Sequence, residues 1–516
     1  MITEHIAPYD NAHKPRLYRF YEMIPGIAVW GTLVLAIALS FVAPHTAMVL
    51  VIIFDLYWLV RVFYYVYNVL AAWRALRGSL ATDWPKLLEE TPGGDDIWHL
   101  VLLPNCAEPL GVMEETFASL AATHYRKDRI IVALAGEERE GAAFKEKAEH
   151  IREQYGSTFK ELLVTVHPDE LPGEIKGKGA NAAWAGKKAQ AYLDAQHISY
   201  DNVILSYFDI DTCVHPNYFA ALTTTFLKNP NRLRSSYQPV ALYNNNIWES
   251  SAIMRVAAFG TTFWLFTELA RPHRLFTFSS HAMPFRALVD VGFWQRDVVT
   301  DDTRIFLQCL LYYNGDYRVT PLYIPVSMHT AMTGGRFASL VNLYKQQRRW
   351  AWGVEHLPYL LWSFRKTPHI PLRRKWTYLW NLGEGMYSWA TAPLLIFILG
   401  RIPLWVAGRS TPESVLLLTT PQLLKHLMDF AMVGIFVSAI LSITLLPKCP
   451  HAHPLRRIPT YAGMLLQWIL LPITLVIFGS IPAIEAQTRL MLGKYLGFWV
   501  TKKRGRKPLT SALEVT

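Results

Sequence analysis

The sequence predicts an α/β domain inserted between α-helical transmembrane segments. Two apolar runs, residues 24–42 and 47–66, open the 516-residue chain, and each approaches the length that crosses the hydrocarbon layer of a membrane. Strand-like and helical patterns then alternate through a more polar stretch at residues 90–345. Apolar segments return near residues 376–404, 430–446 and 461–481.

The two N-terminal runs predict a hairpin, because only the residues APHT separate them. Lys14, Arg16 and Arg19 precede the first run. Arg74 and Arg77 follow the second, whereas the tip carries no Lys or Arg. The positive-inside rule therefore places both ends of the hairpin, and the segment that follows, in the cytoplasm. The polar leader is too long for a cleavable signal peptide, so we expect a multi-pass protein of the cell (plasma or inner) membrane.

Composition narrows the possible partners. The net charge is +11, and 52% of the residues are hydrophobic. Basic residues gather beside the apolar segments, where membrane orientation and anionic lipid account for them, so the charge does not indicate nucleic-acid binding. The four cysteines, Cys106, Cys213, Cys309 and Cys449, lack metal-ligand spacing and imply no disulfide framework.

The polar stretch indicates a parallel sheet covered by helices on both faces. Short apolar runs that end in turn residues predict strands at WHLVLLPNCAEP, DRIIVALAGEE, ELLVTVHPDE and NVILSYFDIDTCVHP. Helical spacing follows the first three, at LGVMEETFASLAAT, at residues 141–156 and at GANAAWAGKKAQAYLDA. Ligands of such sheets bind beyond the carboxyl ends of the strands, which is where the acidic residues of interest stand.

The first acidic pair, Asp209 and Asp211, follows the run at residues 203–208. On an extended chain residues i and i+2 point the same way, so the two carboxylates repel each other unless a cation joins them. A hard divalent ion such as Mg²⁺ or Mn²⁺, especially one bound to a diphosphate, suits the pair. A polar loop with turn-forming aspartates is the structural alternative.

The second pair, Asp301 and Asp302, lies in VVTDDTRIF between a strand-like run and a helical one. Acids at a helix start cap the helix and favour its dipole, and this explanation suits Asp301. Thr300 and Thr303 are further capping candidates, so a second adjacent acid favours a chemical role. A carboxylate beside a metal–diphosphate site is able to act as a general base toward an acceptor hydroxyl.

A cationic and aromatic cluster, LYKQQRRWAWG, occupies residues 343–353. A guanidinium group offers two donors to a diphosphate leaving group, and tryptophan offers a flat apolar face to a sugar ring or an acceptor. QQRRW places these groups on adjacent turns of a helix. Because WGVEHLPYLLWSF continues as an interfacial amphipathic helix, we expect Arg348 and Trp352 to face lipid headgroups.

The order of these motifs resembles the membrane-embedded glycosyltransferases of family 2, the class that includes cellulose, chitin and hyaluronan synthases. The resemblance covers roughly residues 97–355 and the flanking apolar segments. It implies the GT-A nucleotide-sugar fold, which is a Rossmann-like α/β fold. It also implies inverting transfer of a sugar from a nucleoside diphosphate donor, with Mg²⁺ or Mn²⁺ as cofactor.

Three stretches resemble the family's nucleotide-binding motifs. LPNCAEP is similar to a first strand that ends in Asn-Glu-Pro: Glu108 and Pro109 match, and Ala107 replaces the asparagine. Glu137 in LAGEE takes the place of the acid that reads the nucleobase. Lys178 in KGAN resembles the lysine that faces the nucleotide.

The resemblance also assigns metal-binding and catalytic roles. Asp209 and Asp211 match the metal-binding DxD motif. The stretch TDD resembles Thr-Glu-Asp, whose last acid is the catalytic base, so this role falls on Asp302. Asp301, beside it, is expected to contact the donor or the acceptor.

The QxxRW motif of the family is filled by Gln346, Arg349 and Trp350. The resemblance implies that Arg349 binds the nucleotide and that Gln346 and Trp350 contact the donor or the acceptor. One segment departs from the family. Where polysaccharide synthases carry a Cys-Gly or similarly small turn, FTFSSHAMPFRAL has Ser279, Ser280 and His281, so the acceptor is expected to differ from cellulose or chitin.

His281 leaves two interpretations, a hydrogen bond to a sugar or a structural role. Two interpretations of the acceptor also stay open. The first is a polysaccharide that the enzyme extends, from a UDP-sugar, at the membrane. The second is a membrane lipid that receives a single sugar, as in ceramide glucosyltransferases. The expected division is a cytoplasmic leader (1–23), a transmembrane hairpin (24–66), the GT-A domain (90–345), the QxxRW motif and interfacial helix (346–372), a C-terminal transmembrane region (373–484) and a basic tail (485–516).

The C-terminal region contains a conflict of topology. The basic tail TKKRGRK belongs in the cytoplasm, yet three single crossings after a cytoplasmic domain leave it outside. Pro472 and Pro482 interrupt the last apolar segment, so we expect a re-entrant or bent pair of half-spans. Glu384, between Gly383 and Gly385, is expected either to face a polar cavity or partner within the membrane or to lie at the interface.

Overall fold

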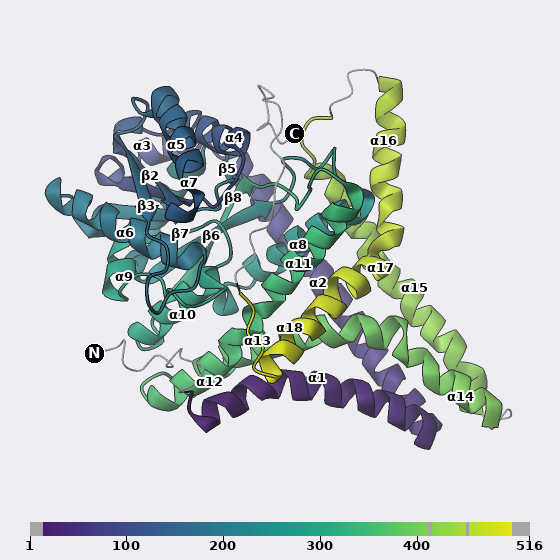
Figure 1. Ribbon diagram of the computed structural model, residues 1–516. Coiled ribbons are helices and arrows are strands. Elements are labelled where there is room, and N and C mark those ends of the chain that lie inside the picture. The colour runs from purple at the N-terminus through teal and green to yellow at the C-terminus, as the bar shows by residue number, and fades with distance from the viewer. Residues whose placement is uncertain (1–13, 411–414, 450–453, 498–516) are drawn as a thin grey trace.

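The computed structural model describes residues 14–410, 415–449 and 454–497, and it has a mixed α/β domain of the GT-A type flanked by long apolar helices (Figure 1). The sheet contains β1 (Trp98–Pro104), β2 (Ile130–Glu137), β3 (Glu161–His167), β4 (Val203–Tyr207), β5 (Cys213–Val214), β6 (Ser235–Leu242), β7 (His281–Pro284) and β8 (Arg318–Ser327). Their order is β3-β2-β1-β4-β7-β6-β8-β5. The predicted strands correspond to β1–β4.

The sheet is mixed, so the prediction of a parallel sheet is correct for one half of it. β3, β2, β1 and β4 are parallel, whereas β7 pairs antiparallel with both β4 and β6. β6 and β8 are again parallel. Every residue of β2 and β4 is buried, as expected for strands covered on both faces.

Helices surround the sheet and extend away from it (Figure 1). Those of the α/β domain are α3 (Trp84–Glu89), α4 (Leu110–Ala121), α5 (Ala142–Tyr155), α6 (Lys178–Ala195), α7 (Tyr218–Lys228), α8 (Ala252–Leu269), α9 (Phe285–Asp290) and α10 (Asp301–Tyr312). Those that follow are α11 (Arg336–Ala351), α12 (His356–Lys366), α13 (Leu372–Phe397), α14 (Ile402–Ser410), α15 (Val415–Thr444), α16 (Pro454–Leu466), α17 (Leu471–Leu475) and α18 (Ile481–Met491).

Within the described residues, five helical segments are long and apolar enough to cross a membrane, which confirms the predicted multi-pass character. The first two are α1 (Arg16–Val42) and α2 (Pro44–Leu80), which form the predicted hairpin. α2 is longer than expected. Its last turns bury Val69, Ala72 and Leu76 in the core of the α/β domain, so one helix joins the membrane region to the sheet.

Glu384 of α13 has a partner in the neighbouring membrane helix. Its carboxylate lies 2.9 Å from the Arg61 guanidinium of α2, and the Ser388 hydroxyl donates to it at 2.8 Å. Of the two expectations for Glu384, the structure therefore favours a charge compensated by a partner.

The last apolar segment is bent, in agreement with its two prolines. The helical segments α16, α17 and α18 are separated by a 3₁₀ turn at Gln467–Leu470 and a π-helical turn at Val476–Ser480. α16 and α18 run in different directions (Figure 1). Pro472 and Pro482 stand in the first turns of α17 and α18, where their missing N–H groups are tolerated.

The end of this bent segment is tied to the start of α1. Arg19 donates to the carbonyl oxygens of Leu490, at 2.7 Å, and of Met491. The Tyr495 hydroxyl donates to Glu22 at 2.6 Å, and Lys14 pairs with the same carboxylate at 2.7 Å. The chain therefore leaves α18 beside the start of α1, which the positive-inside rule predicts to be cytoplasmic.

This contact predicts a cytoplasmic C-terminus. The tail TKKRGRK itself lies outside the described residues, so a cysteine beyond it provides the test. In a chain with its four natural cysteines replaced, Ser511→Cys is expected to resist a membrane-impermeant thiol reagent in intact cells and to react after lysis. His45→Cys, at the tip of the α1–α2 hairpin, is the control that should react without lysis. Ready labelling of Ser511→Cys in intact cells would contradict the prediction.

Candidate functional site

One lysine joins the two acidic motifs. Lys178 begins α6, and its ammonium nitrogen lies 2.8 Å from Asp209 Oδ1 and 2.9 Å from Asp302 Oδ1. The three residues come from the start of α6, the loop after β4 and the start of α10. Of the predicted site residues, these three are thus brought into direct contact at the carboxyl end of β4.

Lys178 is a cation shared by two carboxylates. Burial by itself lowers the pKa of Lys178, but Asp209 and Asp302 outweigh it, so the pKa of the ammonium lies above its ordinary value. The ammonium also lies 4.0 Å from the centre of the Tyr207 ring. Lys178 is therefore a permanent cation that compensates part of the negative charge of Asp209 and Asp302.

The adjacent acids Asp301 and Asp302 have different surroundings. Asp301 is 1% exposed and accepts a hydrogen bond from the Tyr207 hydroxyl. Burial and the neighbouring Asp302 raise the pKa of Asp301. The Asp302 side chain is 20% exposed. Asp301 is thus held inside the protein, and Asp302 is the acid that a ligand reaches.

The DxD stretch forms a turn, so the expectation of an extended chain is wrong here. β4 ends at Tyr207, and the amide of Thr212 donates to the carbonyl oxygen of Asp209 at 2.9 Å. Asp209 accepts from the Ser279 hydroxyl at 2.5 Å, whereas the buried Asp211 accepts from the amide of His329 at 2.8 Å. The two carboxylates consequently have separate hydrogen-bond partners.

Sequence reasoning missed His329 and Glu115. The His329 side chain is fully buried, with Nε2 at 3.2 Å from Glu115 Oε2 and Nδ1 at 3.7 Å from Asp211 Oδ2. His329 follows β8 by two residues. The signal was a histidine at the carboxyl end of a strand, and it was hidden because β8 itself was not predicted.

The glutamates expected to bind nucleotide lie at the carboxyl ends of β1 and β2. Glu137 pairs with Arg139 at 2.5 Å, and both Glu108 and Glu137 are largely buried. Beside them, Glu140 accepts from the amide of Ala107 at 3.0 Å. Ala107 has a φ of 58°, in the left-handed region that asparagine tolerates better than alanine. Position 107 therefore has a left-handed backbone conformation that would suit the asparagine of the family motif, although this chain has alanine there.

The QxxRW motif lies on α11, beside the acidic residues. The Trp350 ring packs against Tyr243, with centroids 5.8 Å apart, and Gln346 is buried. Burial raises the pKa of Tyr243, the carboxylates Asp209, Asp211 and Asp302 raise it further, and Arg349 lowers it. Tyr243, which follows β6, therefore lies between the motif and the acids.

The two residues expected to face lipid headgroups have protein partners. Trp352 is 1% exposed, and its indole N–H donates to Glu355 at 2.9 Å. Arg348 pairs with Glu485 of α18 at 2.6 Å. The prediction for Trp352 is wrong, because an apolar helix face packed on protein has the same sequence pattern as one packed on lipid.

A hydrogen-bonded chain connects this segment to the start of α10. Arg304 Nε donates to Nδ1 of His356 at 3.2 Å, which leaves the imidazole proton on Nε2. Nε2 then donates to the Thr300 hydroxyl at 3.0 Å, and Thr300 donates to Glu355 at 2.6 Å. Burial and Arg304 lower the pKa of His356, so the ring stays neutral. Thr300 immediately precedes Asp301.

His281 lies in β7 and is fully buried. Its Nδ1 lies 2.9 Å from the carbonyl oxygen of Phe278, and the ring packs edge-on against Tyr207 at 5.7 Å. Burial lowers the pKa of His281 to about 4. This geometry corresponds to the structural interpretation of His281, and the contact with a sugar stays a prediction.

The donor set around the DxD turn suits a hard cation that a ligand helps to bind. Within the described residues, no group of three or more His, Cys, Asp or Glu side chains forms a ready-made metal site. Two carboxylates, Asp209 and Asp211, are nonetheless what Mg²⁺ commonly takes from a protein when phosphate oxygens and water complete its shell.

Comparisons with known proteins find relatives in sequence and in structure. Poly-beta-1,6-N-acetyl-D-glucosamine synthases of Staphylococcus aureus, strains MSSA476 and COL, are 26% identical over 323 residues, which cover 62% of this chain and 67% of theirs. Among solved structures, a mannosyltransferase from Pyrobaculum calidifontis in complex with GDP-Man and Mn²⁺ is 15% identical with a TM-score of 0.39, covering 73% of this chain and 99% of that one. S. aureus TarS 1–349 in complex with UDP-GlcNAc is 11% identical with a TM-score of 0.30, covering 77% and 93%.

The structural likenesses are too low to carry the assignment, which rests on the sequence match to a family. The family described as "Glycosyl transferase family group 2" matches residues 204–481, more than half of the chain. The match begins within β4 and ends at the start of α18, so it includes the DxD turn, both residues of the Asp301–Asp302 pair and the QxxRW helix. The chain is therefore a glycosyltransferase that belongs to glycosyl transferase family group 2.

Proposed function

We propose that the protein is an inverting, metal-dependent glycosyltransferase that extends a polysaccharide at the membrane from a nucleoside diphosphate sugar. The contact of Lys178 with both Asp209 and Asp302 carries this proposal, because it brings the metal-binding motif and the proposed base to one ammonium group. The product named for the related S. aureus synthases, poly-beta-1,6-N-acetyl-D-glucosamine, favours a donor that carries N-acetylglucosamine, which we propose is the UDP-sugar. The catalytic domain, residues 90–345, lies on the cytoplasmic side.

Asp209 and Asp211 would hold Mg²⁺ or Mn²⁺. When bound, the ion supplies positive charge to the diphosphate of the donor. Lys178 and Arg349 contribute further cations where negative charge develops on the leaving group. Glu108 and Glu137, at the carboxyl ends of β1 and β2, face the nucleoside. Trp350, with Gln346 on the same helix, lines the path of the acceptor. Because Asp301 is buried, its expected contact with the donor or the acceptor stays a prediction.

Asp302 is the proposed base. It takes the proton from an acceptor hydroxyl as that oxygen bonds to the anomeric carbon of the donor. The bond between the anomeric carbon and the diphosphate oxygen breaks, and the nucleoside diphosphate leaves with the bonding electrons. The buried Asp301 does not compete for this role, since it is already bonded to the Tyr207 hydroxyl.

The proposal is tested with the purified protein and a panel of radiolabelled nucleotide sugars. Release of nucleoside diphosphate identifies the donor, and the product is sized. A long polymer supports the proposal, and a single-sugar lipid replaces it with the alternative acceptor. Absence of transfer from every donor would contradict both.

Replacement of the proposed base should abolish sugar transfer but leave nucleotide binding intact. Asp302→Asn keeps the size of the side chain but removes its basicity. Transfer is expected to fall by about 10²–10⁴-fold, while calorimetry finds nucleotide binding nearly unchanged. Asp316→Asn, at a surface ion pair with Arg234, is the matched control. Substantial turnover by Asp302→Asn would contradict the assignment of Asp302 as the base.

Loss of the second DxD carboxylate should weaken metal-dependent nucleotide binding. Asp211→Asn withdraws one of the two charges proposed to hold the ion, so the nucleotide affinity measured with Mg²⁺ or Mn²⁺ is expected to fall toward the affinity without metal. A chelator should have the same effect on the wild-type protein. Activity that is insensitive to the chelator counts against a metal at both aspartates.

The chain of hydrogen bonds at Thr300 should support both stability and turnover. In Glu355→Gln an NH₂ group takes the place of one carboxylate oxygen. Either the Trp352 indole or Thr300 then loses its hydrogen-bond acceptor. Loss of such a charge-assisted bond costs about 1–3 kcal/mol, so a lower unfolding temperature and a lower kcat are expected, with KM for the donor little changed. Glu153→Gln, on the exposed face of α5, is the control. A wild-type kcat and unfolding temperature would show that Glu355 does not position α10.

A further inference from the structure

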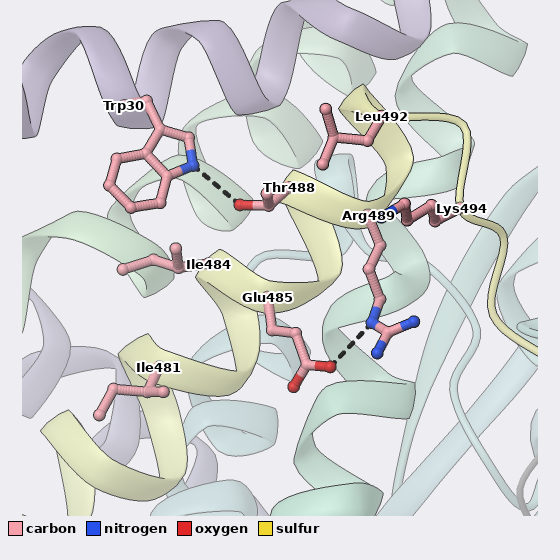
Figure 2. A pocket seen from close by; sticks show the side chains of 8 residues that line it. All are labelled: Trp30, Ile481, Ile484, Glu485, Thr488, Arg489, Leu492 and Lys494. Atoms are coloured by element: carbon pink, nitrogen blue, oxygen red, sulfur yellow. Dashed lines mark hydrogen bonds and ion pairs between the residues drawn. The ribbon is translucent and has the colours of Figure 1, made fainter.

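A groove opens between α1 and α18, away from the proposed catalytic residues. Its volume is about 560 Å³. Eight side chains line it (Figure 2), namely Trp30, Ile481, Ile484, Glu485, Thr488, Arg489, Leu492 and Lys494. Seven of these belong to α18 and the three residues after it, so the groove is essentially one face of α18 closed on one side by Trp30.

The lining has an apolar side and a basic side. Trp30, Ile481 and Ile484 lie together on one side in Figure 2, and Arg489 and Lys494 lie on the other. Trp30 and Ile481 are each 43% exposed. Because α1 and α18 belong to segments apolar enough to cross a membrane, this exposed apolar surface meets lipid rather than water.

The basic side carries an excess of positive charge. Glu485 is shared by two guanidinium groups, Arg489 at 2.8 Å and Arg348 at 2.6 Å, and it also accepts from the Tyr344 hydroxyl at 2.8 Å. Lys494 adds a further cation to the groove. Two guanidinium groups therefore share a single carboxylate, and Lys494 lines the same groove, which leaves positive charge to be compensated by a ligand.

We propose that this groove binds an anionic phospholipid of the cytoplasmic leaflet. Arg489 and Lys494 contact its phosphate, and an acyl chain lies along Trp30, Ile481 and Ile484. A phospholipid provides the anion and the apolar chain within one molecule, which is the combination that the lining requires. Basic residues at an anionic membrane surface each contribute about 1 kcal/mol to such binding.

The bound lipid has a route to the proposed active site. When Arg489 pairs with the lipid phosphate, Glu485 keeps its contacts with Arg348 and Tyr344. Both of these residues belong to α11, which also carries the QxxRW motif. Anionic lipid is therefore expected to fix α11 against α18. This consequence rests on the proposed function, whereas lipid binding itself does not.

Binding is tested on the full-length protein by thermal unfolding in mixed micelles. Added phosphatidylglycerol should raise the unfolding temperature of the wild type more than added phosphatidylcholine does. In Arg489→Gln/Lys494→Gln the apparent affinity for phosphatidylglycerol should fall about thirtyfold. Lys366→Gln/Arg373→Gln, an exposed Arg and Lys pair near the start of α13, is the matched control that keeps the response.

Three outcomes would overturn the proposal. They are equal stabilisation by the two lipids, an unchanged response in the Arg489 and Lys494 variant, and an equal effect of inorganic phosphate alone, which would indicate an anion site without a chain. A phosphatidylglycerol with brominated acyl chains tests the apolar side. It should quench the tryptophan fluorescence of the wild type more than that of Trp30→Phe. Equal quenching of the two proteins would show that no acyl chain lies in the groove beside Trp30.

The coupling is tested separately by sugar transfer. Phosphatidylglycerol should stimulate the wild type, and it should lose this effect in Glu485→Gln. Transfer without any lipid response overturns the coupling and leaves the proposed function intact. A lipid-binding protein without transfer contradicts the proposed function and leaves the lipid site intact.

Discussion

The ammonium group of Lys178 is the interaction on which the rest of the site depends. Asp209, in the loop after β4, and Asp302, at the start of α10, are 93 residues apart, and two carboxylates brought together in a half-buried site repel each other. Lys178 reduces this repulsion, and its place in the first turn of α6 holds both carboxylates at one point. The fold can therefore assemble an acidic site before any ligand or metal ion arrives.

A second constraint holds α10 from the opposite side. Thr300 is bonded to Glu355 and His356, which stand just after the QxxRW helix, while Asp302 is bonded to Lys178. The start of α10 is thus fixed between the α/β domain and the segment that leads to the membrane helices. Movement of that segment would shift the proposed base. The position of Asp302 therefore depends on the segment that leads to the membrane helices.

The sequence predicted the parts of the fold that local patterns determine. β1–β4 and the helices between them follow from apolar runs, turn residues and helical spacing. In the mixed half of the sheet, β7 and β5 were missed because they have only four and two residues, too few for a periodic pattern. β6 and β8 are longer, with eight and ten residues, but both contain proline, which argues against a strand in a sequence pattern. His329 was missed for a related reason: its contacts with Asp211 and Glu115 join distant parts of the chain, and only tertiary packing brings them together.

The bend in the last apolar segment offers a way out of the predicted conflict between charge and crossing number. A straight helix of that length would carry the basic tail across the membrane, but Gly26 of α1 allows α18 to approach so closely that an added Cβ would lie 2.6 Å from that of Met491. Arg19 then bonds the last carbonyl groups of α18. The same helix contacts α11 through Glu485, so α18 ends beside both the start of α1 and the QxxRW helix. The glycine, the arginine and the two prolines together account for the bend and for this close packing, and the return of the segment to the side of the membrane from which it began stays a prediction.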